Sequence, residues 1–244
     1  MTSGTPLAFA ALLAFTGAGT AAANINGPDV SSWQHDGGRL IDWFAVRASG
    51  HEFAMVKATE GLDYVNPFFV PDTLAMRVAG VARGNYHYAR PNLPPEPQAA
   101  FFAATIAAVN GPPGDLPPVL DLEHSGGLPP GALIDWTHRF LNTLESLVHR
   151  RPIIYTYPNF WKTAMANTNQ FTRYPLWIAD YRGNPQPEVI GGWPTWTFWQ
   201  YTDNGFIPGI HGNTDLNFYS GAMGPIELFS NNLSAGSSGS AGSS

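Results

Sequence analysis

The chain has 244 residues, and 44% of them are hydrophobic, so it is long enough to bury one sizeable core. Its formal net charge is −6 and it has no run of basic residues, which argues against a nucleic-acid partner, because phosphate binding needs clustered Lys and Arg. It contains no cysteine, which excludes disulfides and thiolate metal sites.

The first residues have the composition of a secretory signal. Pro6 to Ala23 are uncharged apolar and small residues, and the stretch ends in a small-x-small cleavage pattern, although the usual basic start is missing. We predict a signal peptide at residues 1–23 and therefore secretion; the alternative is an N-terminal helix or anchor. No other stretch approaches the length of a transmembrane helix.

We expect one domain over residues 24–230, followed by a flexible Gly/Ser-rich tail or linker at residues 231–244. About eight short apolar segments of this domain have the composition of strands, at the spacing typical of strand–helix alternation. In chain order the predicted strands are Gly27–Ser31, Phe53–Ala58, Val81–Tyr88, Pro118–Glu123, Pro152–Thr156, Leu176–Asp180, Thr197–Tyr201 and Thr214–Phe218.

Helical patterns fill the gaps between the first five strands, whereas the later gaps are too rich in Gly and Pro for a full helix. The predicted fold is therefore α/β: an irregular TIM-like β/α barrel that lacks helices in its second half. The predicted helices are Arg39–Ala48, Pro67–Ala79, Gln98–Val109 and Leu133–His149, the last with a core-facing stripe of Leu133, Trp136, Phe140, Leu144 and Leu147.

Two carboxylates end the fourth predicted strand. Side chains alternate across a strand, so Asp121 and Glu123 point to one side, while Leu120 and Leu122 point to the other, where a helix could bury them. Burial of two acids is costly, and glycoside hydrolysis is one chemistry that uses two carboxylates in unequal environments. The alternative is a strand end whose acids simply face solvent.

Polar residues follow most of the other predicted strands as well. In a barrel of parallel strands the carboxyl ends of the strands share one rim, where catalytic groups sit. A solvated rim would also be polar, but these groups adjoin apolar runs, where desolvation makes them costly. They include Asp29, Lys57, Glu60, His87, Tyr155, Asp180, Gln200, Asp215 and Asn217.

An ordered set of motifs along the chain resembles the glycoside hydrolase family 25 lysozymes, which are N-acetylmuramidases of bacterial cell walls. The resemblance runs from about Asn24 to Tyr219 and implies an irregular β/α barrel with a groove at the strand C-termini. The motifs are GPDVSSWQ from Gly27, VKATEG from Val56, GNYHY from Gly84, VLDLE from Val119, IYT from Ile154, LWIADY from Leu176, FWQYT from Phe198 and DLNF from Asp215.

The resemblance implies roles for the acids. Glu123 would be the general acid, Asp121 its partner carboxylate, and Asp29 and Asp215 would complete an acidic cluster that raises the pKa of one member. We also expect Lys57, Glu60, His87, Tyr155 and Trp199 to bind substrate. Most of these residues also have a structural alternative. Lys57 could pair with an acid for structural reasons, and His87 could be a rim histidine with its hydrogen bonds satisfied. Core packing is an alternative for four aromatic residues: Tyr155, Trp199, Trp33 and Tyr181.

The attack on the anomeric carbon is not decided by the sequence, because side-chain rotamers set whether two carboxyls are spaced for a retaining or an inverting mechanism. Our hypothesis is substrate assistance, in which the 2-acetamido group of the sugar attacks while Asp121 orients it. Inversion of the first-formed product would contradict this hypothesis.

Two rivals remain for the function. A chitinase-like barrel also uses an Asp-x-Glu strand end, but its D-x-x-D-x-D-x-E pattern fails here at Leu116 and Val119. A non-catalytic glycan-binding barrel would have no need of four buried acids. The expected partner is bacterial peptidoglycan, acted on by a monomer with no cofactor and no metal, since no histidines have metal-ligand spacing.

Overall fold

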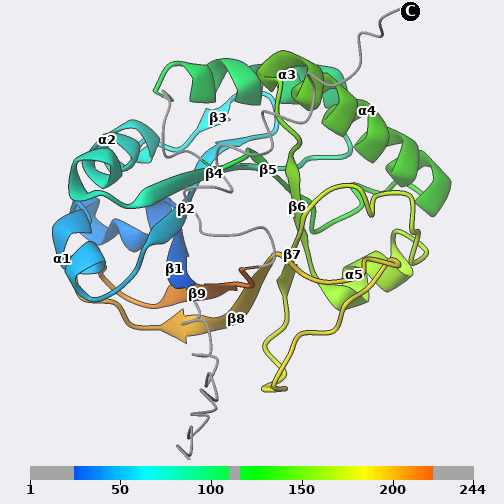
Figure 1. Ribbon diagram of the computed structural model, residues 1–244. Coiled ribbons are helices and arrows are strands. Elements are labelled where there is room, and N and C mark those ends of the chain that lie inside the picture. Colours follow the sequence, from blue (N-terminus) through cyan, green and yellow to red (C-terminus); the bar gives the residue numbers. More distant parts are fainter. Residues whose placement is uncertain (1–24, 110–115, 222–244) are drawn as a thin grey trace, which may run out of the picture.

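A computed structural model describes residues 25–109 and 116–221, which form a closed barrel of strands surrounded by helices (Figure 1). The expected signal peptide and tail lie outside the described residues. The strands are β1 (Ile25–Val30), β2 (Phe53–Glu60), β3 (Tyr64–Val65), β4 (Ala82–Tyr88), β5 (Val119–Asp121), β6 (Ile153–Thr156), β7 (Leu176–Ala179), β8 (Phe198–Gly205) and β9 (Thr214–Tyr219). The helices are α1 (Trp43–Ala48), α2 (Phe69–Ala79), α3 (Pro95–Ala107), α4 (Pro130–Val148) and α5 (Pro158–Thr163), with 3₁₀ turns η1 (Ser32–Gln34) and η2 (Asp36–Gly38).

The barrel closes because β1 pairs with β2 on one side and with β9 on the other. From β1 through β8 the barrel strands run parallel, and the two-residue β3 is an antiparallel addition to β2. β9 is antiparallel to both β8 and β1. The last strand thus departs from the parallel arrangement of the others, because it follows β8 through a short hairpin with no room for a crossover helix.

Two apolar layers form the core. The larger lies between the strands and the surrounding helices and contains the buried residues Leu120 and Leu122, as the alternation predicts. The smaller fills the lower barrel interior with mainly aromatic side chains: Phe53, Met55, Tyr86, Trp177, Phe198 and Tyr219. The barrel interior is thus a packed apolar floor, and polar side chains occupy only the rim above it.

All eight predicted strands are confirmed, and the four predicted helices exist with different starts. Asp42 caps α1 by accepting a hydrogen bond from the amide of Ala45 at 3.0 Å, so the helix begins at Trp43 rather than at Arg39. α3 and α4 begin earlier than predicted because proline is tolerated in the first helical turn. In α4, Leu147 is half exposed, and Leu141 is buried in the core instead.

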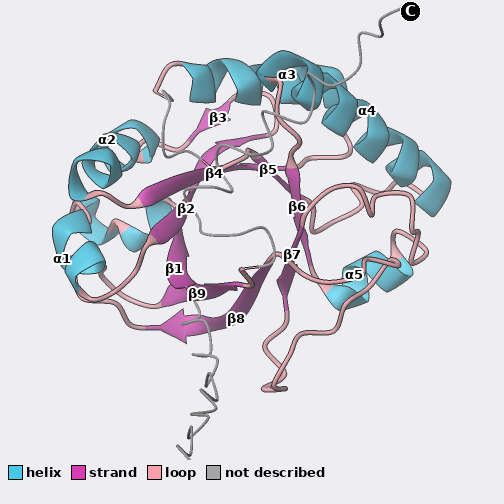
Figure 2. Ribbon diagram, viewed as in Figure 1, coloured by secondary structure: helices cyan, strands magenta, loops and turns pink. Residues whose placement is uncertain are grey.

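The second half of the barrel lacks long helices, as predicted, although the short helix α5 was not predicted. Residues 180–197 and 206–213, all of them described, contain no helix, and Figure 2 shows β8 and β9 uncovered on their outer side. Aromatic side chains cover these strands instead: the rings of Tyr201 and Phe218 stack 4.3 Å apart, and Trp199 lies 5.9 Å from Phe218. No helix of the described segments is long and apolar enough to span a bilayer.

Glycine at position 27 is required by a close approach of two strands. A Cβ added to Gly27 would lie 2.0 Å from the backbone oxygen of Phe53, which cannot move without displacing β2. Gly27→Ala is therefore expected to lower the free energy of unfolding by about 3 kcal/mol, measured by urea denaturation.

Gly131→Ala is the matched control, because Gly131 lies in α4 and an added Cβ meets no atom within 4 Å. This variant should be stabilised by about 0.5 kcal/mol through helix propensity. Equal stability of Gly27→Ala and wild type would show that β1 and β2 do not approach each other this closely.

Candidate active site

Four carboxyl groups meet at one rim of the barrel: Asp29, Asp121, Glu123 and Asp215, called here the acid cluster. Asp29 ends the parallel strand β1 and Asp121 ends β5, so both stand at the carboxyl rim. Asp215 stands near the beginning of β9 and reaches the same rim because β9 is antiparallel, which pairs Asp215 directly with Asp29. Sequence order alone places Asp29 and Asp215 at opposite ends of the chain.

The Asp29–Asp215 pair is held by neutral amide donors. The two carboxyls hydrogen bond to each other, so they share a proton. Gln200 Nε2 donates to Asp29 Oδ2 at 2.7 Å and makes a longer contact of 3.4 Å with Asp215 Oδ2. Asn217 Nδ2 also donates to Asp29 Oδ2, at 2.8 Å. Two good hydrogen bonds therefore converge on one oxygen of Asp29.

The Asp121–Glu123 pair lies on the other side of the barrel mouth. Their side chains hydrogen bond to each other, as the shared strand face predicts. Asp121 is buried, with 5% of its surface exposed, whereas Glu123 is half-buried and lines a cavity. The Oδ1 atom of Asp121 is buried and makes no hydrogen bond within the described part of the chain. A buried acceptor without a donor is costly, so a ligand N–H would be favoured at this atom.

Burial and mutual repulsion favour protonation of the cluster. Burial raises the pKa of Asp29 to about 6, and it raises that of Asp215 to about 8 with help from the charge of Asp29. Burial also raises the pKa of Glu123, and the neighbouring Asp215 adds to this effect. The pKa of Asp121 is raised strongly, by burial first and then by the charge of Glu123. Near neutral pH the cluster therefore retains protons.

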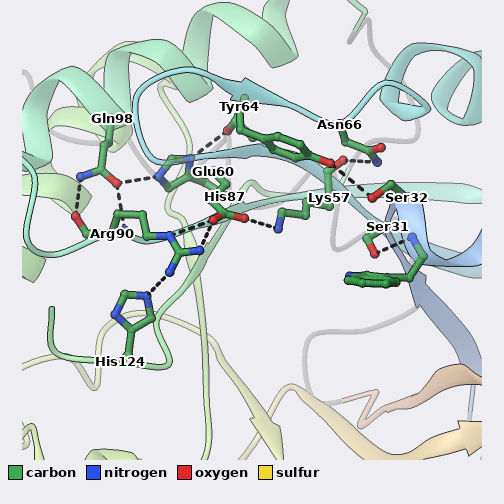
Figure 3. Close-up of polar contacts among 12 residues, drawn as sticks. Ser31, Ser32, Lys57, Glu60, Tyr64, Asn66, His87, Arg90, Gln98 and His124 are labelled. Carbon is green, nitrogen blue, oxygen red and sulfur yellow. Dashed lines mark hydrogen bonds and ion pairs between the residues drawn. The ribbon is translucent and has the colours of Figure 1, made fainter.

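A chain of ion pairs joins Lys57, Glu60 and Arg90 at the rim (Figure 3). Lys57 Nζ lies 2.6 Å from Glu60 Oε2, which confirms the acid partner expected for Lys57. Arg90 Nε donates to the other carboxylate oxygen of Glu60 at 2.8 Å, and Arg90 also contacts His124. The charge of Lys57 acts on both cluster acids and opposes the rise in their pKa.

A bulge in β2 brings Lys57 and Glu60 together. The register with β4 shifts between Lys57 and Thr59, so residues three apart reach the same side instead of opposite sides. The side chain of Asn66 secures the bulge by donating to the carbonyl of Lys57 at 2.9 Å. The predicted strand ends at Ala58, and sequence patterns do not reveal the bulge.

A cavity of about 590 Å³ opens beside Glu123. Tyrosine side chains form part of its wall, and charged side chains from α5 and from the loop after β7 form another part. Residues of both kinds line it: Tyr155, Tyr157, Tyr181, Lys162 and Arg182. The cavity can hold a group of sugar size, with Glu123 at its inner edge. Its lining mixes apolar and polar groups, as is usual for ligand sites.

Five residues were expected to bind substrate, and the structure brings three of them to the rim. Lys57 and Glu60 stand beside Asp121 and Glu123, and Tyr155 lines the cavity with its hydroxyl donating to Gln200 at 2.7 Å. His87 and Trp199 are elsewhere, because they sit on the outer faces of their strands, one residue out of phase with the rim-facing positions.

His87 belongs to the layer between sheet and helices, so the structure contradicts the expected substrate contact. It is fully buried, contacts Thr59 Oγ1 at 2.8 Å and Gln98 Oε1 at 3.1 Å, and its ring lies against Phe102 and Phe140. Burial lowers the pKa of His87 to about 4. The alternative of a satisfied histidine describes this residue, although it lies below the rim.

Trp199 also faces away from the acid cluster. Its indole nitrogen donates to the carbonyl of Asp180 at 2.9 Å, and its ring belongs to the aromatic cover of β8 and β9. The missing helix explains this position, because a strand without a covering helix needs a large side chain to shield its outer face. Of the eight tryptophans only Trp33, at 86% exposed, projects into solvent; it follows Asp29 in η1.

Sequence patterns identified the acids but not the groups that hold them. Gln200 and Asn217 were noted only as polar rim residues, and Arg90 was not noted at all. Parity along the strand gives the missing signal for two of them, since Gln200 and Asn217 alternate with the outward residues Trp199 and Phe218. The described residues include no group of three or more acidic or histidine side chains placed to hold a metal ion.

Comparison with known proteins agrees with this geometry. The family model described as glycosyl hydrolases family 25 matches residues 28–210. Lysozyme M1 of Streptomyces globisporus is 35% identical over 218 residues, covering 86% of this chain and 72% of that protein. The N,O-diacetylmuramidase of Chalaropsis sp. is 31% identical over 203 residues, covering 76% and 94%.

Solved structures give the same result. The bacterial lysozyme from Streptomyces coelicolor superposes with a TM-score of 0.80 at 34% identity, covering 87% of this chain and 99% of that one. A family GH25 lysozyme from Aspergillus fumigatus superposes with a TM-score of 0.75 at 30% identity, covering 87% and 100%. The chain therefore belongs to glycosyl hydrolase family 25.

Proposed function

We propose that this glycoside hydrolase is a secreted muramidase that cleaves the β-1,4 bond between N-acetylmuramic acid and N-acetylglucosamine in bacterial peptidoglycan. Its named relatives are lysozymes and muramidases. One observation carries the assignment of the site: a hydrogen-bonded Asp121–Glu123 pair stands at the edge of a cavity, with a second carboxyl pair close enough to act on it electrostatically.

Glu123 is the general acid of this proposal. It is the member of its pair that lines the cavity, so it can reach the glycosidic oxygen, whereas Asp121 is buried behind it. Its raised pKa favours the protonated form, which the leaving group requires. Lys57 limits the rise, so that Glu123 can also give the proton up.

Asp121 orients the attacking group in a substrate-assisted first step. The acetamido oxygen attacks the anomeric carbon while the bond to the leaving oxygen breaks and that oxygen takes the proton of Glu123. The free Oδ1 of Asp121 supports this role, because it can accept the acetamido N–H and align the group. Water then opens the cyclic intermediate, and its proton returns to Glu123. Negative charge on Asp29 stabilises the oxocarbenium-like transition state.

The substrate lies along the rim between the cavity and the β1 side. Tyr155 at the cavity, and Lys57 with Glu60 on the opposite wall, supply hydrogen-bonding groups for sugar hydroxyls and amides. Trp33 extends this surface as a flat platform. The side chains of Ser31 and Gln34 form a capping box around the turn that carries it, so the turn is rigid.

Export of the enzyme rests on residues 1–23, which we propose to be a removed signal peptide. A cell-wall substrate lies outside the bacterial membrane, which agrees with a secreted enzyme. The domain is then residues 24–230, with the Gly/Ser-rich residues 231–244 as a tail, and it acts as a monomer because one chain supplies the whole acid cluster.

Glu123→Gln tests the catalytic assignment, because it keeps the side-chain shape and removes the transferable proton. Release of reducing ends from purified cell walls should fall by about 10³-fold. Mass spectrometry of the wild-type products should identify muramic acid at the new reducing end, whereas a chitinase-like enzyme would leave glucosamine and a binding module would release nothing. A Glu123→Gln enzyme as active as wild type would remove Glu123 from its role.

Trp33→Ala tests the platform. Loss of one aromatic contact of about 1.5 kcal/mol should raise KM for soluble peptidoglycan chains roughly tenfold, with kcat nearly unchanged because the contact is equal in ground and transition states. Phe44→Ala is the control, since Phe44 is exposed on the outer helix α1 and its loss should leave KM unaltered. An unchanged KM for Trp33→Ala would place the chain of sugars elsewhere.

Asp215→Asn tests whether the acid cluster costs stability. The raised pKa of Asp215 means that the folded state binds more protons than the unfolded state between about pH 4 and pH 8, so wild-type stability falls as pH rises through this range. The Asn side chain does not titrate, so the variant does not lose this stability as the pH rises. Its melting temperature should exceed that of wild type at pH 8, and the difference should shrink towards pH 4.

Asp63→Asn, an exposed carboxylate in the turn between β2 and β3, is the matched control and should show a constant difference across the range. A difference for Asp215→Asn that does not grow with pH would contradict the buried, proton-retaining carboxyl described above.

A further inference from the structure

Gln200 contacts four side chains at the barrel mouth, three from strands and one from the loop after β7, although the proposed reaction gives it no role. Its Oε1 accepts hydrogen bonds from the hydroxyls of Tyr155, at 2.7 Å, and of Tyr181. Its Nε2 donates to Asp29 and approaches Asp215 at 3.4 Å. Only 2% of Gln200 is exposed, so these protein groups replace its contacts with water.

The carboxylate of Asp29 fixes the direction of this amide. A flipped amide would set its oxygen against Asp29 Oδ2, which is an acceptor facing an acceptor. Burial raises the pKa of both tyrosine hydroxyls, so they remain protonated and can donate to Oε1 in the observed orientation. The observed orientation is therefore preferred.

The two contacts of Nε2 are unequal. The bond to Asp29 is 0.7 Å shorter than the contact with Asp215 (3.4 against 2.7 Å), and Asn217 adds a second donor to the same oxygen of Asp29. Hydrogen bonds to a charged acceptor are stronger than those to a neutral one, so this arrangement favours the ionised form of Asp29.

We propose that Gln200 is a positioning residue that distributes the proton shared by Asp29 and Asp215: it keeps the negative charge on Asp29 and leaves the proton on Asp215. The order of their pKa values, about 6 and about 8, agrees with this direction. The consequence for hydrolysis rests on the function proposed above, in which Asp29 must be ionised.

Other charges act on the two members of this pair unequally. Glu123 raises the pKa of Asp29, whereas Asp203 raises that of Asp215 and so acts in the same direction as Gln200. Arg182, the cation nearest in sequence to Tyr181, is bound to Asp180 at 2.6 Å instead. The ionisable groups that interact with Gln200 or the pair are Tyr86 from β4, Tyr155 from β6, Tyr181 after β7, Asp203 from β8, and Glu123 across the mouth.

Gln200→Met tests the proposal, because it keeps the length of the side chain and removes both N–H donors. The carboxyl carbons of Asp29 and Asp215 are titrated by carbon-13 NMR and assigned with Asp29→Asn and Asp215→Asn. Loss of a hydrogen bond to a charged group should raise the pKa of Asp29 by about one unit, with a smaller change at Asp215. The acidic limb of the kcat profile should move upward by a similar amount.

Gln98→Met is the matched control. Gln98 is also a fully buried glutamine with all its hydrogen bonds made, but its partners are His87 and the loop before α3. It should lose stability without moving the titration of Asp29. This comparison separates proton placement from general destabilisation.

Gln200→Glu is the second variant if Gln200→Met does not fold. Its carboxylate still accepts from both tyrosines, but it has no N–H for Asp29, and the pKa of Asp29 should again rise. An unshifted Asp29 titration in either folded variant overturns the proposal. Because the titration needs no substrate, it decides the question even if wild type fails to hydrolyse peptidoglycan, a failure that would refute only the proposed function.

Discussion

The contact between Asp29 and Asp215 is the constraint on which the rest of the site depends. It exists because β9 enters the barrel antiparallel between β8 and β1, which sets the beginning of one strand against the end of the other. A parallel last strand would have carried Asp215 to the opposite rim. The same closure brings Gln200 and Asn217 next to Asp29, so one topological exception assembles both the acids and the donors that hold them.

The barrel brings the four acids together, and it also makes their burial energetically costly. Beneath the acids lies an apolar floor of mainly aromatic side chains, and burial is the largest cause of every raised pKa in the cluster. A fold selected for stability alone would not collect four such groups. The aromatic floor therefore has two effects, since it stabilises the barrel by apolar burial and maintains the proton affinity of the groups above it.

Local patterns in the sequence were sufficient for the strands, for the long helices and for the Asp121–Glu123 pair, because each of these depends on neighbours within a few residues. Asp29 and Asp215 joined the expected cluster only through the family resemblance. Asp121 and Glu123 could be placed on one face from strand alternation alone. Positions that depend on other parts of the fold could not be predicted in this way. His87 and Trp199 face outward because their strands pair in one register and not the next, and Lys57 meets Glu60 only through a bulge.

The cost of burying the two carboxyl pairs is offset by different groups, and this difference matches the role proposed for each pair. Lys57 lies near Asp121 and Glu123 and lowers their proton affinity against the effect of burial. The Asp29–Asp215 pair has only neutral donors, the amides of Gln200 and Asn217. A nearby full positive charge favours ionisation of both members of a pair, whereas a directed amide can favour one member over the other. A site that must transfer a proton at Glu123 and keep a fixed charge at Asp29 needs both a nearby cation and a directed amide. The barrel mouth places Lys57 on one side and Gln200 on the other.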